Sequence, residues 1–183
     1  MESKVEKKLY EALAKIVSKG EEKISVSTLC EKADVSRASF YIYYKDLDDF
    51  EAKCRMYVSE RLFEQVLTIT ENFVTPNECN ILLDENDVAL LKFFTGKHVY
   101  WNFAEDANEI VAPRFKKLMT ERWGEEYYEE NKQLFEFVLN GSVGTLYLDI
   151  VDFNKAKFVR SMNYITGIVR ELFPEDKLNI RQN

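Results

Sequence analysis

The chain has 183 residues, of which 46% are hydrophobic and 31% are charged, a composition that indicates a globular protein and excludes a disordered one. No apolar run approaches the roughly 20 residues that a membrane-spanning helix needs. Residues 1–6 are charged and lack the apolar core of a signal peptide. We therefore expect a cytoplasmic protein with no membrane partner. Its few glycines and prolines favour long helices over a sheet with many hairpins.

The charge is unevenly distributed. The net charge of −7 is unusual for a protein that binds nucleic acid. Residues 1–45, however, hold nine basic and seven acidic side chains, a balance of +2, whereas residues 46–183 hold sixteen and twenty-five, a balance of −9. Any contact with DNA is therefore expected at the amino-terminal end. Because +2 is small, such binding would depend on a few well-placed contacts and on dimerisation.

The sequence lacks the residues that most enzymes and metal sites need. There is a single histidine, His98, and the three cysteines are widely spaced without a CxxC pair, which favours ordinary reduced thiols. We find no glycine-rich phosphate loop and no nucleophile motif. We therefore expect no enzymatic activity, no metal site and no cofactor.

The first predicted helix covers residues 4–19, because apolar residues recur there at helical spacing. Gly20 is a suitable residue to end it. The apolar positions are Val5, Leu9, Ala12, Leu13, Ile16 and Val17.

Residues 26–45 predict two short helices around a tight turn. Asp34 tolerates a left-handed backbone better than most residues, and Ser36 is a good N-cap for the second helix. Phe40 is expected to face the core. The outward side chains would be cations, hydroxyls and phenols, namely Arg37, Ser39, Tyr41 and Tyr43, with Lys45 just beyond. Such a set is suited to a DNA major groove and predicts a helix-turn-helix.

Asp46 is expected to cap a long helix that keeps its apolar stripe to about residue 71. A short helix ending near Gly96 follows, and then a helix over residues 107–123 that Pro113 either starts or kinks.

One long helix is predicted over residues 126–152, and a last helix starts at residue 154 or 155. Gly141 and Gly144 lie in the middle of the long helix and predict a close approach by another helix. The whole pattern predicts an all-α fold with two domains, a helix-turn-helix domain over residues 1–46 and a helical ligand-binding and dimerisation domain over residues 47–183.

Residues 33–50 resemble the DNA-binding motif of the TetR/AcrR family of bacterial transcriptional regulators. The matching run is Ala33-Asp34-Val35-Ser36, three further residues, Phe40-Tyr41, Ile42, Tyr43-Tyr44 and Lys45-Asp46-Leu47. The resemblance is strong over residues 5–60 and weaker over 134–173. Asp34 replaces the turn glycine of the family, and Leu47 stands where a phosphate-contacting lysine is common.

The resemblance implies a set of DNA contacts. Arg37 and Ser39 would reach base edges, Tyr41, Tyr43 and Lys45 would lie at phosphates, and Ser27 or Thr28 would anchor the preceding helix. Ser36 and Ala38 complete the predicted DNA-binding set. The structural alternatives are a solvated charge for Arg37, edge packing for the tyrosines, and helix capping alone for Ser27 and Thr28.

Aromatic side chains of the body are candidates for an effector pocket. The predicted lining is Phe94, His98, Trp101, Phe103, Phe115 and Phe135. The alternative for each aromatic residue is an ordinary place in the core.

The sequence therefore predicts a homodimeric transcriptional repressor that binds a near-palindromic operator in double-stranded DNA and is released by a small-molecule effector. The last two helices of each protomer would form the dimer interface. The alternative is a helical small-molecule sensor or carrier whose DNA-binding motif is weakened or lost.

Overall fold

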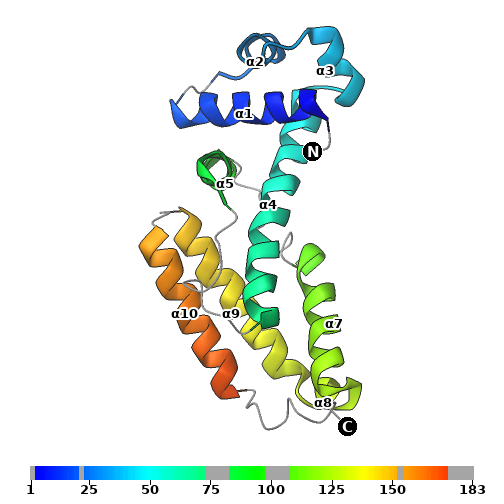
Figure 1. The fold of residues 1–183 in the computed structure, drawn as a ribbon, viewed down its shortest axis with the longest axis vertical. Helices are drawn as coiled ribbons and strands as arrows, with labels where there is room; N and C mark the ends of the chain where they lie inside the picture. The colour runs from blue at the N-terminus through cyan, green and yellow to red at the C-terminus, as the bar shows by residue number, and fades with distance from the viewer. Residues whose placement is uncertain (1–2, 21–22, 73–82, 98–107, 152–154, 173–183) are drawn as a thin grey trace. The chain divides into compact units, whose positions relative to one another are not determined.

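The computed structural model describes residues 3–20, 23–72, 83–97, 108–151 and 155–172 (Figure 1). These residues form helices and connecting turns, with no strand among them, which confirms the predicted all-α class. Within the same ranges, no helix combines the length and the apolar character required to cross a membrane. The chain divides into two compact units, the first comprising Met1–Arg61 with Leu83–Val99 and the second Leu62–Leu82 with Tyr100–Asn183.

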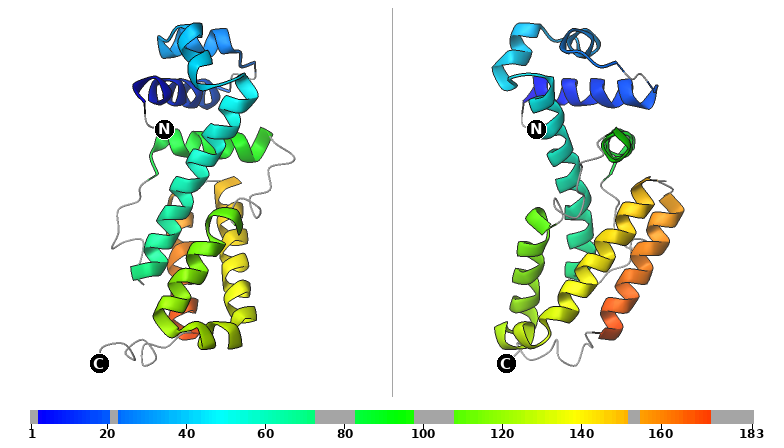
Figure 2. Two further views of the ribbon diagram at one scale, coloured as in Figure 1. Left: turned by 90° about the vertical axis from the view of Figure 1, so that its right-hand side faces the viewer. Right: turned by 180° about the vertical axis from the view of Figure 1, so that it is seen from behind.

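The first unit holds α1 (Lys4–Ser18), α2 (Val26–Ala33), α3 (Arg37–Tyr43), the first part of α4 (Leu47–Asn72) and α5 (Glu85–Lys97). Within this unit α1 lies between the α2–α3 pair on one side and α5 on the other, as Figures 1 and 2 show. Helix α1 is therefore the centre of the first unit.

Helix α1 begins with a capping box, in which Ser3 Oγ accepts from the Glu6 N–H at 3.1 Å and Glu6 Oε2 accepts from the Ser3 N–H at 3.0 Å. It ends at Ser18, and Gly20 follows two residues later with a φ of +70°, a conformation that glycine adopts without strain. Its buried face is wider than the predicted stripe, because Tyr10 and Ala14 are buried too. Those two side chains are buried because helices pack on both sides of α1.

The first unit is larger than the predicted domain over residues 1–46. It also contains the beginning of α4 and all of α5, because their side chains complete the same core. Phe50 and Cys54 of α4 are fully buried there, as is Phe94 of α5. Helix α5 is thus a part of the amino-terminal unit that comes from a distant place in the sequence.

The second unit holds the end of α4, α7 (Ala112–Trp123), α8 (Glu125–Glu130), α9 (Lys132–Val151) and α10 (Lys155–Leu172). Helices α9 and α10 run antiparallel, side by side, in Figure 1 and in the right-hand view of Figure 2.

Helix α7 has Pro113 in its first turn, so this proline starts the helix rather than kinking it. Gly124, at φ +93°, ends α7. The core of the second unit includes the buried side chains of Leu62, Phe63, Val111, Phe115, Met119, Tyr128, Phe135, Val138, Val143, Phe158 and Met162.

The prediction of one helix over residues 126–152 is wrong, because Asn131 interrupts it. Asn131 lies at φ −109° and ψ 15°, outside the helical region. Its Nδ2 donates to the Tyr127 carbonyl at 2.9 Å, and its N–H donates to the carbonyls of Tyr127 and Tyr128. Asparagine offers the backbone such a local alternative to helix hydrogen bonds, and two helices result.

The expected close approach at Gly141 and Gly144 is absent from the part of the chain that the structure describes. Both glycines are exposed, and a Cβ added at either one would meet no atom within 4 Å. The small residues therefore leave notches open on the surface of α9.

Candidate nucleic-acid interface

The turn between α2 and α3 is built on Asp34. Its φ of 51° and ψ of 54° place it in the left-handed region, as predicted, and it is the one non-glycine residue with positive φ among those described. The Val35 N–H donates to the Cys30 carbonyl at 3.0 Å, which closes the end of α2. Lys8 of α1 donates to both the carbonyl and the carboxylate of Asp34, at 3.3 and 3.2 Å. Lys8 therefore contacts the turn at a left-handed position where glycine is common.

Serines cap both short helices. Ser25 Oγ accepts from the Thr28 N–H at 3.1 Å, so Ser25 is the N-cap of α2, and Ser36 Oγ accepts from the Ser39 N–H at 3.0 Å, which confirms Ser36 as the N-cap of α3. The hydroxyls of Ser25 and Thr28 are 2.9 Å apart, and those of Ser36 and Ser39 are 2.8 Å apart. Thr28, Ser36 and Ser39 therefore have structural partners within the protein.

Helix α3 is held to the unit from one side. Phe40 is its only buried side chain, and its ring packs against Tyr44 and Phe50 at centroid distances of 5.3 and 5.8 Å. Tyr44 and Phe50 meet edge to face at 4.9 Å, and the Tyr44 hydroxyl donates to Glu6 Oε1 at 3.3 Å. The predicted core role of Phe40 is confirmed, and Tyr44 is buried beside it.

The opposite side of α3 is exposed. Tyr41 is 49% exposed, Ile42 76% and Tyr43 36%. Arg37, Ala38 and Lys45 are exposed as well. Of the nine predicted DNA-binding residues, Thr28 and Ser39 are half-buried and the other seven are exposed, on α2, α3 and the segments beside them. The structure thus brings the predicted set onto one unit with its side chains accessible.

Ile42 is the exposed residue of α3 that sequence reasoning passed over. The motif treats its position as variable, and an isoleucine is normally assigned to a core. The signal that would have found it is helical spacing, since it follows Ala38 by four residues and cannot share the side of Phe40.

The start of α4 fastens the end of α3. Asp46 Oδ1 accepts from the Asp49 N–H at 2.8 Å, which confirms Asp46 as the cap of α4. Asp49 Oδ2 accepts from the Lys45 N–H at 3.0 Å, a bond that lowers the pKa of Asp49, and from Lys53 Nζ at 3.3 Å. Lys53 also donates to the Tyr43 carbonyl at 3.1 Å, so its ammonium closes the end of α3. Leu47 is half-buried within this connection.

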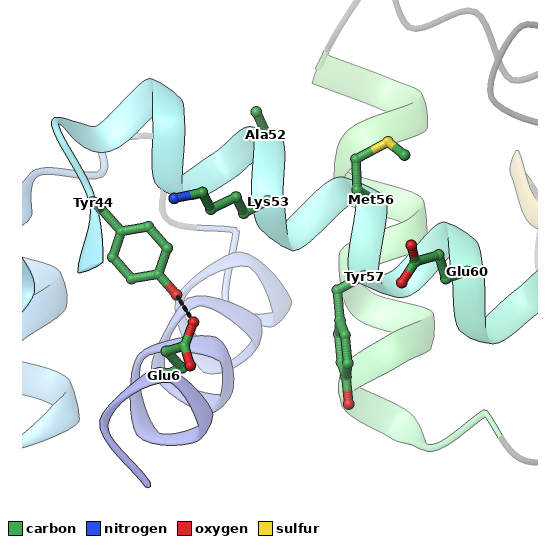
Figure 3. A pocket seen from close by; sticks show the side chains of 7 residues that line it. All are labelled: Glu6, Tyr44, Ala52, Lys53, Met56, Tyr57 and Glu60. Carbon is green, nitrogen blue, oxygen red and sulfur yellow. Dashed lines mark hydrogen bonds between the residues drawn. The ribbon is translucent and has the colours of Figure 1, made fainter. Parts of the chain in front are cut away.

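A groove of about 350 Å³ lies beside this connection (Figure 3). Its lining is Glu6, Tyr44, Ala52, Lys53, Met56, Tyr57 and Glu60. The Lys53 ammonium lies 5.0 Å from the Tyr44 ring centroid, and the two carboxylates leave the groove with a negative balance. This acidic face is unsuited to phosphate, so it bounds the candidate interface on one side.

A buried carboxylate joins three helices of the first unit. Asp87 of α5 is 1% exposed and accepts from the Tyr10 hydroxyl at 2.6 Å and from Arg61 Nε at 2.9 Å. Arg61 also lies over the Tyr57 ring, which in turn meets Tyr10 edge to face at 5.1 Å. Sequence reasoning missed this cluster, because nothing in the pattern indicates that α5 packs on α1.

The residues predicted to line an effector pocket do not lie together in the structure. Phe115 and Phe135 both line a cavity of about 270 Å³ in the second unit, whereas Phe94 is buried in the first unit. His98, Trp101 and Phe103 lie outside the described residues. The cavity is lined by Asn108, Ala112, Phe115, Tyr128, Phe135, Glu136, Leu139 and Asn140.

The aromatic wall of this cavity is ordered by contacts between rings. Tyr128 stacks on Phe135 at 5.1 Å with an interplanar angle of 17°, and Phe115 meets Phe135 at 6.1 Å. The amides of Asn108 and Asn140 and the carboxylate of Glu136 supply the polar part of the lining. The cavity therefore combines an aromatic wall with amide and carboxylate groups.

The described residues hold no cluster of His, Cys, Asp and Glu that could bind a metal ion. Burial raises the pKa values of the Cys30 and Cys54 thiols, which disfavours the reactive thiolate. Comparison of the chain with protein-family models, with curated proteins and with solved structures finds no match.

Proposed function

We propose that this chain is a DNA-binding transcriptional regulator that acts as a homodimeric repressor. The observation that carries the proposal is the exposed face of α3, which presents Arg37, Tyr41 and Tyr43 while Phe40 holds the helix from behind. A seven-residue helix with one buried side chain contributes little to a core, so its outward side chains need another role. In this proposal α2, the Asp34 turn and α3 form a helix-turn-helix, and α3 is the recognition helix.

The chemistry of the exposed side chains fits a duplex. The major groove is about 12 Å wide and admits one helix. The Tyr41 and Tyr43 hydroxyls and the Lys45 ammonium would donate to phosphates, and Arg37 would donate to a base edge. The hydroxyls of Ser36 and Ser39 are already used in capping, so we assign them to the positioning of α3 rather than to base readout.

Dimerisation is proposed through α9 and α10. Phe137 of α9 is 73% exposed and Tyr164 of α10 is 71% exposed, and both are large for an open surface. The same two helices carry exposed glycines at 141, 144 and 167 where an added Cβ would meet nothing within 4 Å. A two-fold axis would place the aromatic side chains of one protomer in the glycine notches of its partner, which is the self-complementarity that an isologous interface needs.

A small-molecule effector is proposed for the cavity between α7, α8 and α9. Helix α4 starts beside α3 in the first unit and ends in the second, where Glu64 pairs with Arg114 of α7. An effector that fits the cavity better in one arrangement of α4 and α7 would change the spacing of the two recognition helices.

The test is a fluorescence-anisotropy titration against two DNA duplexes of equal length, one from the region beside the gene and one with the same bases shuffled. We expect tighter binding to the natural duplex by at least tenfold, at salt concentrations between 50 and 300 mM. Equal affinity for both duplexes across that range would refute the proposal.

The second candidate function is a helical sensor or carrier without useful DNA affinity. It is favoured by the ion pairs of Lys8 with Asp34 and of Lys53 with Asp49, because these pairs leave two cations less available to DNA. Leu47 also favours it, since it stands where the family that the motif resembles often has a phosphate-contacting lysine. Arg37→Ala and Tyr43→Ala separate the two candidates, because both side chains are exposed and the variants should fold normally. DNA binding that is unchanged in both variants favours the sensor.

A further inference from the structure

The two residues of α3 that lie farthest from its buried side, Ala38 and Ile42, are apolar. Ile42 is 76% exposed, the highest value for a large hydrophobic side chain among the described residues, and Ala38 precedes it by four residues. Single exposed hydrophobic residues are common on protein surfaces. This one is distinctive because of its position relative to the buried side of the helix.

Helix geometry places Ala38 and Ile42 opposite the core. With about 100° between successive residues, both lie about 160° from Phe40, one on each side of the opposite point. Arg37 and Tyr41 then form one flank of the exposed face, and Ser39 and Tyr43 form the other. A partner that approaches α3 from the side opposite Phe40 contacts Ala38 and Ile42 first, and hydrogen-bonding side chains lie on either side of them.

From this arrangement we propose that Ile42, together with Ala38, reads the C5-methyl groups of thymines in each operator half-site. The inference rests on the proposed function, since it requires α3 to enter the major groove. Thymine is the only base that presents a methyl group there. An isoleucine side chain has no donor or acceptor, so it pairs favourably with that methyl group and leaves the polar edge of a G·C pair without a partner.

The conformation of the Ile42 side chain is restricted, which suits this role. Isoleucine is β-branched, so its χ1 angle is restricted in a helix and its methyl groups have a fixed direction. The neighbouring Tyr41 ring packs edge to face on Phe40 at 5.3 Å, which supports the adjacent part of the exposed face from the core. The half-site is therefore expected to hold thymines opposite Ile42, with bases contacted by Arg37 on one side of them.

The experiment replaces thymine by deoxyuracil, which lacks only the methyl group. A binding site is first obtained by selection from a random DNA pool, and each thymine is then replaced in turn and the dissociation constant measured by anisotropy. We expect one or two thymines in each half-site whose replacement weakens binding about fourfold, the value of one buried methyl group. The sensitivity should fall in Ile42→Ala, which keeps only the smaller contact of Ala38 and one methyl group at position 42, and persist in Ile42→Val.

The outcomes separate the two proposals. A selection that yields no consensus refutes the proposed function itself. A consensus whose affinity does not change at any deoxyuracil position refutes only the methyl readout, as does a deoxyuracil effect of equal size in the wild type and in Ile42→Ala. Circular dichroism and thermal melting of both variants verify folding, which an exposed position should leave unchanged.

Discussion

The Tyr10 hydroxyl donates a hydrogen bond of 2.6 Å to Oδ1 of Asp87, a residue 77 positions away in the chain. The other carboxylate oxygen of Asp87 accepts from Arg61 and from the Asp84 N–H. One buried carboxylate therefore fixes α1, α4 and α5 together. Because α1 also contacts α2 and α3, this carboxylate sets the frame on which the exposed face of α3 is held.

Tyr10→Phe removes the hydroxyl and keeps the ring. The carboxylate of Asp87, which is 1% exposed, loses a donor that water cannot easily replace. We expect the free energy of unfolding to fall by about 1.5–3 kcal/mol, the range for hydrogen bonds to charged groups. Urea denaturation measures it. Tyr41→Phe is the matched control, since Tyr41 is 49% exposed, and its effect should be close to zero. Equal effects of the two variants would contradict the assigned role of the bond.

Stability is expected to fall at alkaline pH. The pKa of Tyr10 is raised by burial and by its bond to Asp87, and the pKa of Tyr44 is raised by burial and by the nearby Glu6 carboxylate. Both groups stay protonated in the folded state while the unfolded chain loses these protons above pH of about 10. The stability that they contribute is therefore complete below that pH and is lost as the pH rises.

The slope should be about 1.4 kcal/mol per pH unit for each of the two tyrosines between pH of about 10 and 12. Urea denaturation at a series of pH values measures it. Tyr10→Phe should remove one proton's share of the slope. A slope that is the same in Tyr10→Phe and in the wild type would show that Tyr10 titrates alike in both states.

Local signals in the sequence predicted much of the fold. Ser36 and Asp46 were identified as caps, Asp34 as the left-handed residue and Phe40 as the core contact of α3, because each depends on neighbours within four positions. The break at Asn131 was not predicted, because hydrophobic periodicity continues across it. The hydrogen bond from the Asn131 amide to a helix carbonyl cannot be recognised from hydrophobic spacing.

Long-range relationships could not be predicted. The bond from Tyr10 to Asp87 depends on α5 packing against α1, which is a tertiary arrangement without a local sequence signal. The predicted interface residues share one unit because they lie within one continuous stretch, whereas the predicted pocket residues do not lie together. Of the cavity, Phe115 and Phe135 were identified, but the polar residues Asn108 and Asn140 were missed.

Asp34→Asn is expected to strengthen DNA binding without changing stability. Asparagine tolerates the left-handed backbone as aspartate does. The Asp34 side chain is 98% exposed, so the ion pair that it forms with Lys8 contributes little to folding. The variant removes a negative charge from each recognition unit and releases a lysine. Affinity at 0.1 M salt should rise roughly threefold or more by the Coulomb estimate. Glu130→Gln on α8 is the control, with no expected change, and an unchanged affinity in Asp34→Asn would place the turn away from the DNA.

The salt dependence of DNA binding should show whether Lys45 contacts a phosphate. Each phosphate contact contributes about −0.9 to the slope of log K against log salt concentration, and a dimer carries two copies of Lys45. Lys45→Ala should therefore reduce the magnitude of the slope by about two. Lys117→Ala, in the acidic second unit, should leave the slope unchanged. The measurement is an anisotropy titration at five salt concentrations, and equal slopes for wild type and Lys45→Ala would exclude a phosphate contact at this lysine.

The proposed dimer interface predicts a change of oligomeric state. Phe137→Glu and Tyr164→Glu place a charge where an aromatic side chain would enter a glycine notch of the partner. Because both positions are more than 70% exposed in the single chain, neither variant should unfold the protomer. Sedimentation-equilibrium measurements should show a dimer for the wild type and a monomer for each variant.

One further variant serves as a control for the proposed dimer interface, and another tests the glycine side of the contact. Lys132→Glu introduces the same carboxylate at the exposed start of α9, with a change of two charge units instead of one, away from Phe137, and should stay dimeric. Gly144→Leu fills a notch that is empty in the protomer, so it should weaken the dimer while the protomer keeps its fold. A dimer that persists in Phe137→Glu, Tyr164→Glu and Gly144→Leu would place the contact between protomers on another surface. DNA affinity should fall together with dimerisation, because each half-site then binds alone and the gain from two linked contacts is lost.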